Sequence, residues 1–333
     1  MTIALIDNKK VWDDFIDQSP QGQLFHKWDA LKIIEKHTGY KLFTYAVYKG
    51  NAIIGVFPVF YRNINGIKAI FSPPPNTCVP YMGFAMCTEY SGLKQKRKEH
   101  YLSSVVDEVN AEINKLGPNF ISANIIPGFI DVRPFKWNHY AGDLNFTFII
   151  DLERPLEDIM ASFDSTCKKN IKKMEKLDLP IEPTTDVETF YDIMNRRYNE
   201  QGIKMPMISA KYLKDIREAF PDNIKLYFLY NEGKVAGLNG NIEYKDKVTL
   251  WLGNANMHMD FAANDYLVWQ FIKSAKERGF KRLEIQGAGE KRLSEFKSKF
   301  SPTLELCHYI YKKDNLGKLA EVAYANIVRK KWV

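Results

Sequence analysis

Cysteine and histidine are scarce in this sequence, and neither shows the spacing of a metal site. The four cysteines, Cys78, Cys87, Cys167 and Cys307, lie far apart, and no Cys-x-x-Cys pair or nearby histidine occurs. Zinc sites and disulfide frameworks both depend on closely spaced ligands or paired cysteines. We therefore expect no bound metal and four reduced thiols, as is usual in the cytoplasm.

Long hydrophobic runs are also missing. No stretch of 18 apolar residues occurs, so the sequence predicts no membrane-spanning helix. The first ten residues carry no apolar segment behind a basic start, so a secretory signal is not expected either. Both absences favour a cytoplasmic location.

The composition is that of a large globular protein with a mild excess of positive charge. The chain has 333 residues, of which 45% are hydrophobic, and this length favours two domains. The formal net charge is +7. A basic balance of this size suits an anionic ligand such as a nucleotide, coenzyme A or tRNA.

The sequence contains a weak internal repeat. Each copy has two apolar, β-rich runs around a short turn, then a helical segment, a glycine and a buried strand. The turns are residues 49–51 and 231–233; the helices are expected at 96–116 and 262–278, and the strands after them at 120–124 and 282–285. The order predicts two mixed α/β domains, each with a central sheet. The apolar strand at 145–152 places their boundary between residues 1–148 and 149–333.

The order of several sequence blocks carries a family likeness. In the second half these blocks are DLERPLEDIMASF from Asp151, the lysine-rich KKNIKKMEK, the meander LYFLYNEGKVAGLNGNIEYKDKVTLWLGNAN, EIQGAG and FKSKF. In the first half they are Trp28–Leu31, IIGVFPVF, SPPP and DVRPFKW. The second-half blocks resemble the Fem/BioF2-like branch of the GNAT acyltransferase superfamily, and the first-half blocks are similar to archaeal and bacterial proteins known only as GNAT N-acetyltransferases. The likeness covers nearly the whole chain.

This resemblance implies two tandem GNAT-like domains packed around a shared groove. It also implies N-acyl transfer by direct attack, without a covalent enzyme intermediate. No cofactor would be tightly bound; acyl-CoA or aminoacyl-tRNA would serve as co-substrate. The expected acceptor is a small-molecule or peptide-like amine, with tRNA as a candidate partner and no DNA. A peptidoglycan precursor is the acceptor of the Fem ligases.

The same resemblance selects Phe296 and Lys297 as catalytic candidates. They match the Phe-Lys pair near the end of Fem-type enzymes, where the lysine is placed to meet phosphate or developing negative charge. A flexible ammonium group suits that role. The alternative is a solvated lysine on a basic surface helix.

A donor phosphate is expected at the start of the helix that follows the second meander, at Ala262, Ala263, Asn264 and Asp265. Free N–H groups at a helix N-terminus bind anions. Ordinary GNAT enzymes carry a glycine-rich loop there, whereas this chain has no glycine between Gly253 and Gly279. The missing glycine-rich loop favours aminoacyl-tRNA or an unusual thioester as the donor. The alternative is that Asp260 or Asn264 only caps the helix.

Six residues are candidates for substrate binding. Trp251 and Asn254 end the third strand of the meander, where GNAT enzymes bind the acyl carbonyl. A core tryptophan is an equal alternative for Trp251. Arg196 and Tyr198 lie on a helix of the second half, and Asp131 and Arg133 on a loop of the first, where a structural ion pair is the alternative.

A run of five lysines between residues 168 and 176 is the last feature with a functional interpretation. Lys168, Lys172 and Lys176 share one helical face and could track RNA phosphates. A solvated basic helix is the alternative. The run also supports a competing function, a non-catalytic RNA- or nucleotide-binding module or adaptor that kept the fold.

Overall fold

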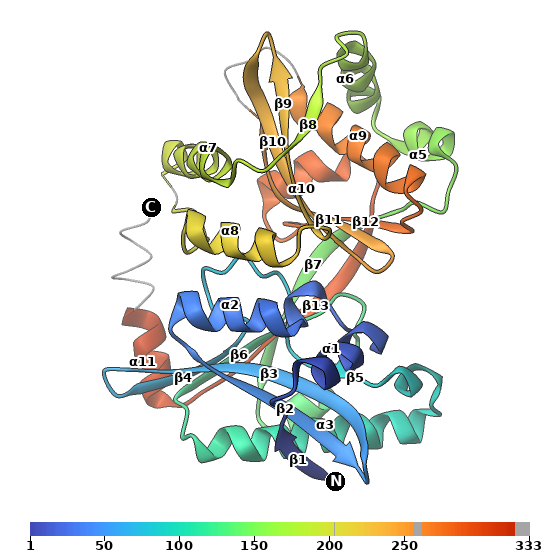
Figure 1. Cartoon of the computed structure of the whole chain (residues 1–333). Coiled ribbons are helices and arrows are strands. Elements are labelled where there is room, and N and C mark those ends of the chain that lie inside the picture. Colours follow the sequence, from blue (N-terminus) through green and yellow to red (C-terminus); the bar gives the residue numbers. More distant parts are fainter. Residues whose placement is uncertain (203, 256–261, 324–333) are drawn as a thin grey trace. The chain divides into compact units, whose positions relative to one another are not determined.

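The computed structural model describes residues 1–202, 204–255 and 262–323, and these form two compact units (Figure 1). Unit 1 contains residues 1–144 and 202–208, together with the chain from Cys307 onward; unit 2 contains 145–201 and 209–306. The chain first passes from unit 1 to unit 2 within strand β7 (Ala141–Asp151). It returns to unit 1 within β13 (Thr303–Lys313).

Unit 1 is built on a sheet with the order β1-β2-β3-β4-β6-β13. The neighbours are antiparallel except β4 and β6, which are parallel, and the short β5 pairs with β3. The strands are β1 (Thr2–Leu5), β2 (Lys41–Lys49), β3 (Ala52–Ile64), β4 (Ile67–Ser72), β5 (Ala85–Met86) and β6 (Phe120–Ile125). The helices are α1 (Lys9–Gln18), η1 (Leu24–His26), α2 (Trp28–Thr38), η2 (Thr88–Gly92), α3 (Gln95–Lys115), α4 (Arg133–Trp137) and α11 (Asn315–Ala323).

Unit 2 repeats this plan with the order β8-β9-β10-β11-β12-β7. Here β11 and β12 are the parallel pair and the other neighbours are antiparallel. The strands are β8 (Ile181–Thr184), β9 (Ile224–Asn231), β10 (Lys234–Tyr244), β11 (Lys247–Ala255) and β12 (Arg282–Ile285). The helices are α5 (Leu156–Ser162), α6 (Ser165–Glu175), α7 (Val187–Glu200), α8 (Ala210–Ala219), α9 (Ala263–Glu277) and α10 (Lys291–Ser298).

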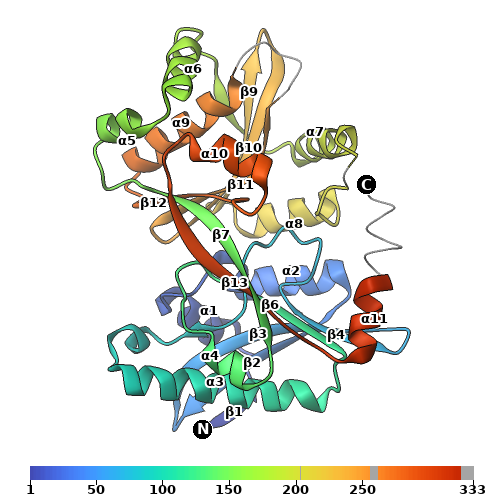
Figure 2. The ribbon, with the colours of Figure 1, turned by 180° about the vertical axis from the view of Figure 1, so that it is seen from behind.

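In each unit the long helix between the two parallel strands covers one face of the sheet. In unit 1, Val105 and Val109 of α3 pack on Val47 and Val59, and α2 covers the other face (Figure 1). In unit 2, α9 is apolar on most of its surface because it packs on the sheet and also on α6 (Figure 2). Helices α7 and α8 cover the opposite face.

The repeat predicted from the sequence is therefore present. The predicted hairpins are β2–β3 and β9–β10, and the predicted helix and strand that follow are α3 with β6, and α9 with β12. The order and relative directions of the six strands agree between the two units, whereas β5 of unit 1 has no counterpart in unit 2. The mixed α/β fold class is confirmed.

Helix α11 is anchored to unit 1 through a glycine that has no room for a side chain. A Cβ atom on Gly317 would lie 2.0 Å from the carbonyl oxygen of Asn119. The backbone N–H of Gly317 also donates to Asp314 at 2.7 Å, and the Asn119 side chain donates to Asp314 at 2.9 Å. The start of the helix is thus fixed against the backbone of the segment before β6.

Replacing Gly317 by alanine is expected to lower the free energy of unfolding by about 2 kcal/mol, because the backbone must move to admit the methyl group. Thermal unfolding measures this loss, and hydrogen exchange should accelerate in residues 315–323. Gly92→Ala is the matched control, since its added Cβ would meet nothing within 4 Å. Equal melting temperatures for the two variants would contradict the packing described.

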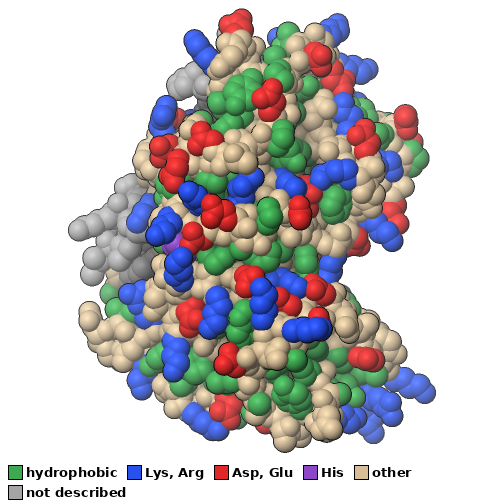
Figure 3. All heavy atoms as spheres, viewed as in Figure 1, with side chains coloured by type: hydrophobic (Ala, Val, Ile, Leu, Met, Phe, Trp, Pro, Cys, Tyr) green, Lys and Arg blue, Asp and Glu red, His purple; other side chains and the backbone are tan. Residues whose placement is uncertain are grey.

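Charged side chains of both signs are interspersed over the face shown in Figure 3. Within the described residues, no helix combines the length and the apolar character needed to cross a membrane. Nor does any group of three or more histidine, cysteine, aspartate or glutamate side chains in that part of the chain form a metal site.

Candidate active site

In unit 2 the two parallel strands part from one another. Strands β11 and β12 are paired only from Lys247 with Arg282 to Leu250 with Ile285. Beyond this point β11 continues to Ala255 but pairs with β10 alone, while β12 ends. A register shift puts Leu250 opposite Asn241 and Leu252 opposite Gly240, so Trp251 is an extra residue in the strand. Such a bulge bends a strand away from its neighbour.

Lys297 lies at the end of β12, where the strands part. Its Nζ donates a hydrogen bond to the carbonyl oxygen of Gln286, the first residue after the strand. Gly287 leaves the space for this contact, because a Cβ atom there would lie 2.9 Å from Nζ. Helix α10 thus places the ammonium group against the backbone that directly follows β12. A ligand bound at this end of the strand would lie near it.

The surroundings of Lys297 disfavour its charged form. Burial lowers its pKa to about 8, from the ordinary value of 10.5. Within the described residues, no carboxylate forms an ion pair with it. Phe296 packs beside it in α10, with its ring 5.8 Å from that of Phe300. A half-buried ammonium without an ionic partner costs stability, and such groups are found where a protein needs to attract negative charge.

Replacing Lys297 by methionine is expected to raise the free energy of unfolding at pH 7 by about 2 kcal/mol, because the desolvation penalty disappears. The unfolded chain binds more protons than the folded chain between pH 8 and 10.5. The stability of the wild type therefore rises through that window, and the advantage of the variant disappears above it. Denaturant unfolding at pH 7 and pH 10.5 measures both values.

Lys291→Met provides the control for this comparison. Its side chain is 91% exposed on the same helix, so its removal should leave stability unchanged at either pH. A Lys297→Met variant that is less stable than the wild type at pH 7 would show that the ammonium stabilises the fold instead.

The N-terminus of α9 holds a buried carboxylate. Asp265 is 1% exposed, accepts a hydrogen bond from Asn170 of α6 at 2.8 Å, and forms an ion pair with Lys299. Lys299 also lies over the ring of Phe296, 3.9 Å from its centre. Ala262 is the N-cap and supplies no side-chain hydrogen bond to the helix, so the alternative that Asn264 caps it is wrong, and Asp260 lies outside the described residues. The predicted phosphate-binding residues Ala262, Ala263, Asn264 and Asp265 thus form the first turn of α9.

A second buried carboxylate stands one residue before the strands part. Glu284 of β12 is fully buried and accepts hydrogen bonds from Thr147 at 2.9 Å, Lys247 at 2.6 Å and Thr249 at 3.1 Å. These partners come from β7 and β11, the two neighbours of β12. Glu284 therefore connects β7, β11 and β12 through hydrogen bonds next to the opening, the point where β11 and β12 part.

The remaining predicted residues of unit 2 are dispersed. Trp251 is buried at the bulge. The backbone of Asn254 pairs with Leu238, but its side chain lies outside the described residues. Arg196 and Tyr198 belong to α7, on the sheet face opposite α9, and Arg196 is exposed. The structure brings Phe296 and Lys297 together, and Asp265 of the α9 turn meets Lys299 two residues further on.

In unit 1, Asp131 and Arg133 bond to each other. The Arg133 guanidinium contacts Asp131 at 2.8 Å and Glu99 at 2.7 Å, and stacks over the Trp137 ring at 5.8 Å. The ion pair with Arg133 holds the pKa of Asp131 below its ordinary value. The guanidinium thus has two carboxylate partners already, which matches the structural alternative.

Sequence reasoning missed several polar residues around the opening, in particular Lys299, Glu284 and the buried pair Asn239 and Asn241. The Asn239 side chain donates to Asn241 at 2.5 Å, and its oxygen would lie 2.8 Å from a Cβ atom on Gly253. A polar residue inside an apolar strand was the available signal, as in Arg282-Leu283-Glu284-Ile285. The glycine at position 253 is explained by this contact.

Comparison with known proteins agrees with this geometry. Residues 161–298 match the family model described as "Acetyltransferase (GNAT) domain". No curated protein matches the chain. Similar solved structures include FemX, with 13% identity, a TM-score of 0.72 and coverage of 98% of this chain and 100% of FemX.

Two further structures have the same arrangement. L-PGS from Bacillus licheniformis is 10% identical with a TM-score of 0.59, and the match covers 98% of this chain and 99% of that one. A tandem GNAT protein from the clavulanic acid biosynthesis pathway is 9% identical with a TM-score of 0.53, covering 93% and 98%. The chain therefore has a Fem-like double GNAT fold, within which residues 161–298 match the GNAT acetyltransferase domain.

Proposed function

We propose that this chain is an N-acyltransferase that acts where β11 and β12 of unit 2 part. The observation that carries the proposal is the ammonium group of Lys297, half-buried at the end of β12 and without a carboxylate partner in the described part of the chain. The GNAT match over residues 161–298 includes these strands, α9 and Lys297, and agrees with an acyl-transfer site.

The reaction follows from the groups available. The acceptor amine attacks the acyl carbonyl, a carbon–nitrogen bond forms, and the bond from the carbonyl carbon to the donor sulfur or oxygen breaks. The amine proton passes through water to the leaving group. Negative charge develops on the carbonyl oxygen in between, and a cation preorganised in a partly dry site stabilises it. Holding donor and amine in line supplies much of the remaining rate.

No cysteine nucleophile is needed for this route. Burial raises the pKa of the Cys167 thiol to about 12, which leaves it protonated near neutral pH. A protonated thiol is a poor nucleophile. Direct attack by the amine is the mechanism that we propose.

The features near the α9 N-terminus favour aminoacyl-tRNA over acyl-CoA as donor. The carboxylate of Asp265 already lies in the first turn of α9, and the sequence has no glycine between Gly253 and Gly279. Helix α6 packs on α9 and carries exposed lysines without carboxylate partners among the described residues. These are Lys169, Lys172 and Lys173, followed by Lys176 at the C-cap. A row of exposed cations beside the site suits a long polyanion.

Binding of the two donors tests this proposal. We expect aminoacyl-tRNA to bind with an affinity that falls steeply with salt, and acetyl-CoA to bind more weakly. Lys172→Glu/Lys173→Glu should weaken tRNA binding at least tenfold at low salt. Lys211→Glu/Lys214→Glu on α8, exposed on the other face of the same unit, is the matched control. Tight acetyl-CoA binding that the α6 variant leaves unchanged would reverse the choice of donor.

The competing function is a non-catalytic RNA-binding module, which the α6 lysines also favour. It predicts equal binding of aminoacylated and deacylated tRNA, with no transfer to any amine. An enzyme should bind the aminoacylated form at least as tightly and release its amino acid to an acceptor. Equal binding of the two forms fits both functions, so transfer of the amino acid to an amine is the result that distinguishes them.

A further inference from the structure

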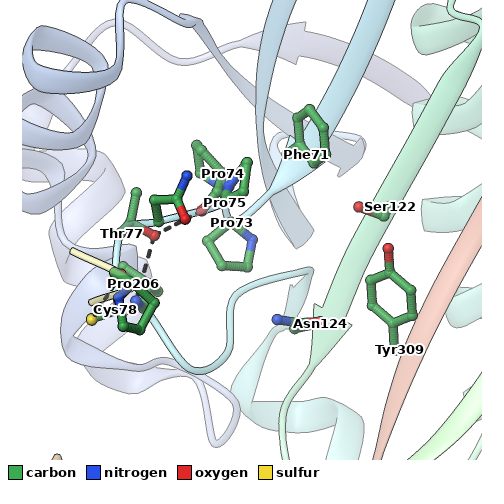
Figure 4. Close-up of a pocket in the computed structure, with 12 residues that line it drawn as sticks. Phe71, Pro73, Pro74, Pro75, Thr77, Cys78, Ser122, Asn124, Pro206 and Tyr309 are labelled. Carbon is green, nitrogen blue, oxygen red and sulfur yellow. Dashed lines mark hydrogen bonds between the residues drawn. The ribbon is translucent and has the colours of Figure 1, made fainter. Parts of the chain in front are cut away.

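Unit 1 has an opening at the position equivalent to the site in unit 2. Strands β4 and β6 are paired from Ala69 with Phe120 to Ser72 with Ala123. The chain then leaves the sheet through Pro73, Pro74 and Pro75, while β6 continues to Ile125. The space between them is a pocket of about 320 Å³ (Figure 4). This volume lies in the lower range of small-molecule sites.

The outer wall of the pocket is a rigid loop. The side-chain hydroxyl of Thr77 donates to the carbonyl oxygen of Pro74 at 2.8 Å, and the Cys78 thiol donates to that of Pro206 at 2.9 Å. The backbone of Thr77 also forms a bridge with Met207. At the base, the Ser72 hydroxyl accepts from the N–H of Gly83 at 3.0 Å. These contacts fix the loop that forms the wall of the pocket.

The pocket has one apolar side and one polar side. Phe71 and the rings of the three consecutive prolines form the apolar side. Figure 4 shows Ser122, Asn124 and Tyr309 across from the prolines, on strands β6 and β13. The hydroxyls of Ser122 and Tyr309 point towards each other, and the Asn124 amide donates to the carbonyl oxygen of Pro80 at 3.3 Å. Donors and acceptors thus lie together on one wall.

None of the described residues that line this pocket is charged. The lining contains no lysine, arginine, histidine, aspartate or glutamate. Burial raises the pKa of Tyr309, so its hydroxyl remains a neutral donor. Burial also raises the pKa of Cys78 to about 12, so its thiol is neither an anion nor a nucleophile. A charged ligand group would lose its hydration here without gaining an ionic partner, which is costly.

We propose that this pocket binds an uncharged, flat organic group with an amide-type edge. The proline and phenylalanine rings offer a surface on which a flat ring packs. The hydroxyl and carboxamide groups opposite offer both a donor and an acceptor, as an amide edge requires. The two equivalent openings would then differ in charge preference, since that of unit 2 carries the half-buried ammonium of Lys297 and the lining of the unit 1 pocket carries no charge.

Benzamide and benzoate are matched probes, because they have nearly the same shape and differ in charge. We expect saturable binding of benzamide to the full chain in saturation-transfer NMR, and binding of benzoate at least ten times weaker. Tyr309→Phe should weaken benzamide binding about fivefold, the usual effect of one lost hydrogen bond. Tyr311→Phe is the control, since it lies two residues further along the same strand and does not line the pocket.

Three results would overturn this inference. Benzoate could bind as well as benzamide, benzamide could fail to bind to folded protein, or Tyr309→Phe and Tyr311→Phe could have the same affinity as the wild type. Circular dichroism of each variant establishes that it is folded. None of these measurements depends on acyl transfer, so the pocket can be tested even if the proposed activity is wrong.

Discussion

Replacing Lys297 by alanine is expected to slow acyl transfer at least a hundredfold. We assign stabilisation of the carbonyl oxyanion at the end of β12 to this ammonium, and removing a single preorganised oxyanion donor costs about 10²–10³ in rate. Donor affinity should change little, because the interaction strengthens only in the transition state. Single-turnover transfer at saturating donor measures the rate, and titration of the donor measures the affinity.

The pH dependence provides an independent check of this role. The pKa of Lys297 is lowered to about 8, so the fraction that carries a charge falls as pH rises through 8. If the charge acts in transfer, the rate should fall over the same range. An acceptor whose amine is already deprotonated at pH 7 isolates this effect. Lys297→Arg should remove the fall, since a guanidinium stays charged.

Lys291→Ala is the control for both experiments, because that lysine is exposed and belongs to the same helix. A Lys297→Ala variant with the rate of the wild type would remove the residue from the mechanism. A rate that drops only together with donor affinity would make it a binding residue.

Replacing Glu284 by alanine is expected to lower the free energy of unfolding by about 3–5 kcal/mol. The change leaves Lys247 without its carboxylate and two buried threonine hydroxyls without an acceptor. Breaking a buried ion pair from one side costs this much because the remaining charge is left uncompensated. Denaturant unfolding of the full chain, compared between variant and wild type, measures the loss.

Glu284→Gln removes the negative charge but keeps nearly the same side-chain shape, so it distinguishes the effect of the charge from that of the lost volume. It keeps an acceptor for one threonine, so its loss should be smaller than that of Glu284→Ala. Glu153→Ala tests an exposed ion pair, Lys281 with Glu153 at 3.9 Å, and should cost less than about 1 kcal/mol. Equal losses for Glu284→Ala and Glu153→Ala would mean that the carboxylate of Glu284 is not buried between the strands.

The parts of the fold that sequence reasoning predicted are those with local causes. The turns at Gly50 and Gly233 both have positive φ, and Gly279 ends α9 in the same way. These positions, with the apolar runs between them, determine the hairpins and the helix–strand units. The assignment of β7 and β13 to sheets had no such signal, because their pairing depends on partners far away in the sequence.

Sequence reasoning selected only those candidate-site residues that are neighbours in the sequence. Phe296 and Lys297 are adjacent, and their resemblance to a known pair was sufficient to select them. Lys299 and Asp265 are separated by 34 positions, and Ser122 and Tyr309 by more than half of the chain. Their proximity follows from the folded sheets. The exposed run at Lys172 and Lys173 was visible at once, but its place beside α9 was not.

The most direct test of the proposed acyltransferase is a transfer assay with both donors and a mixture of small and peptide-like amines. The product is detected by mass spectrometry as an acylated amine. We predict that the wild type and Lys291→Ala form such a product from at least one donor, and that Lys297→Ala forms at least a hundredfold less. No product from either donor with folded wild-type protein, or equal product from Lys297→Ala, would contradict an acyl-transfer site at the end of β12.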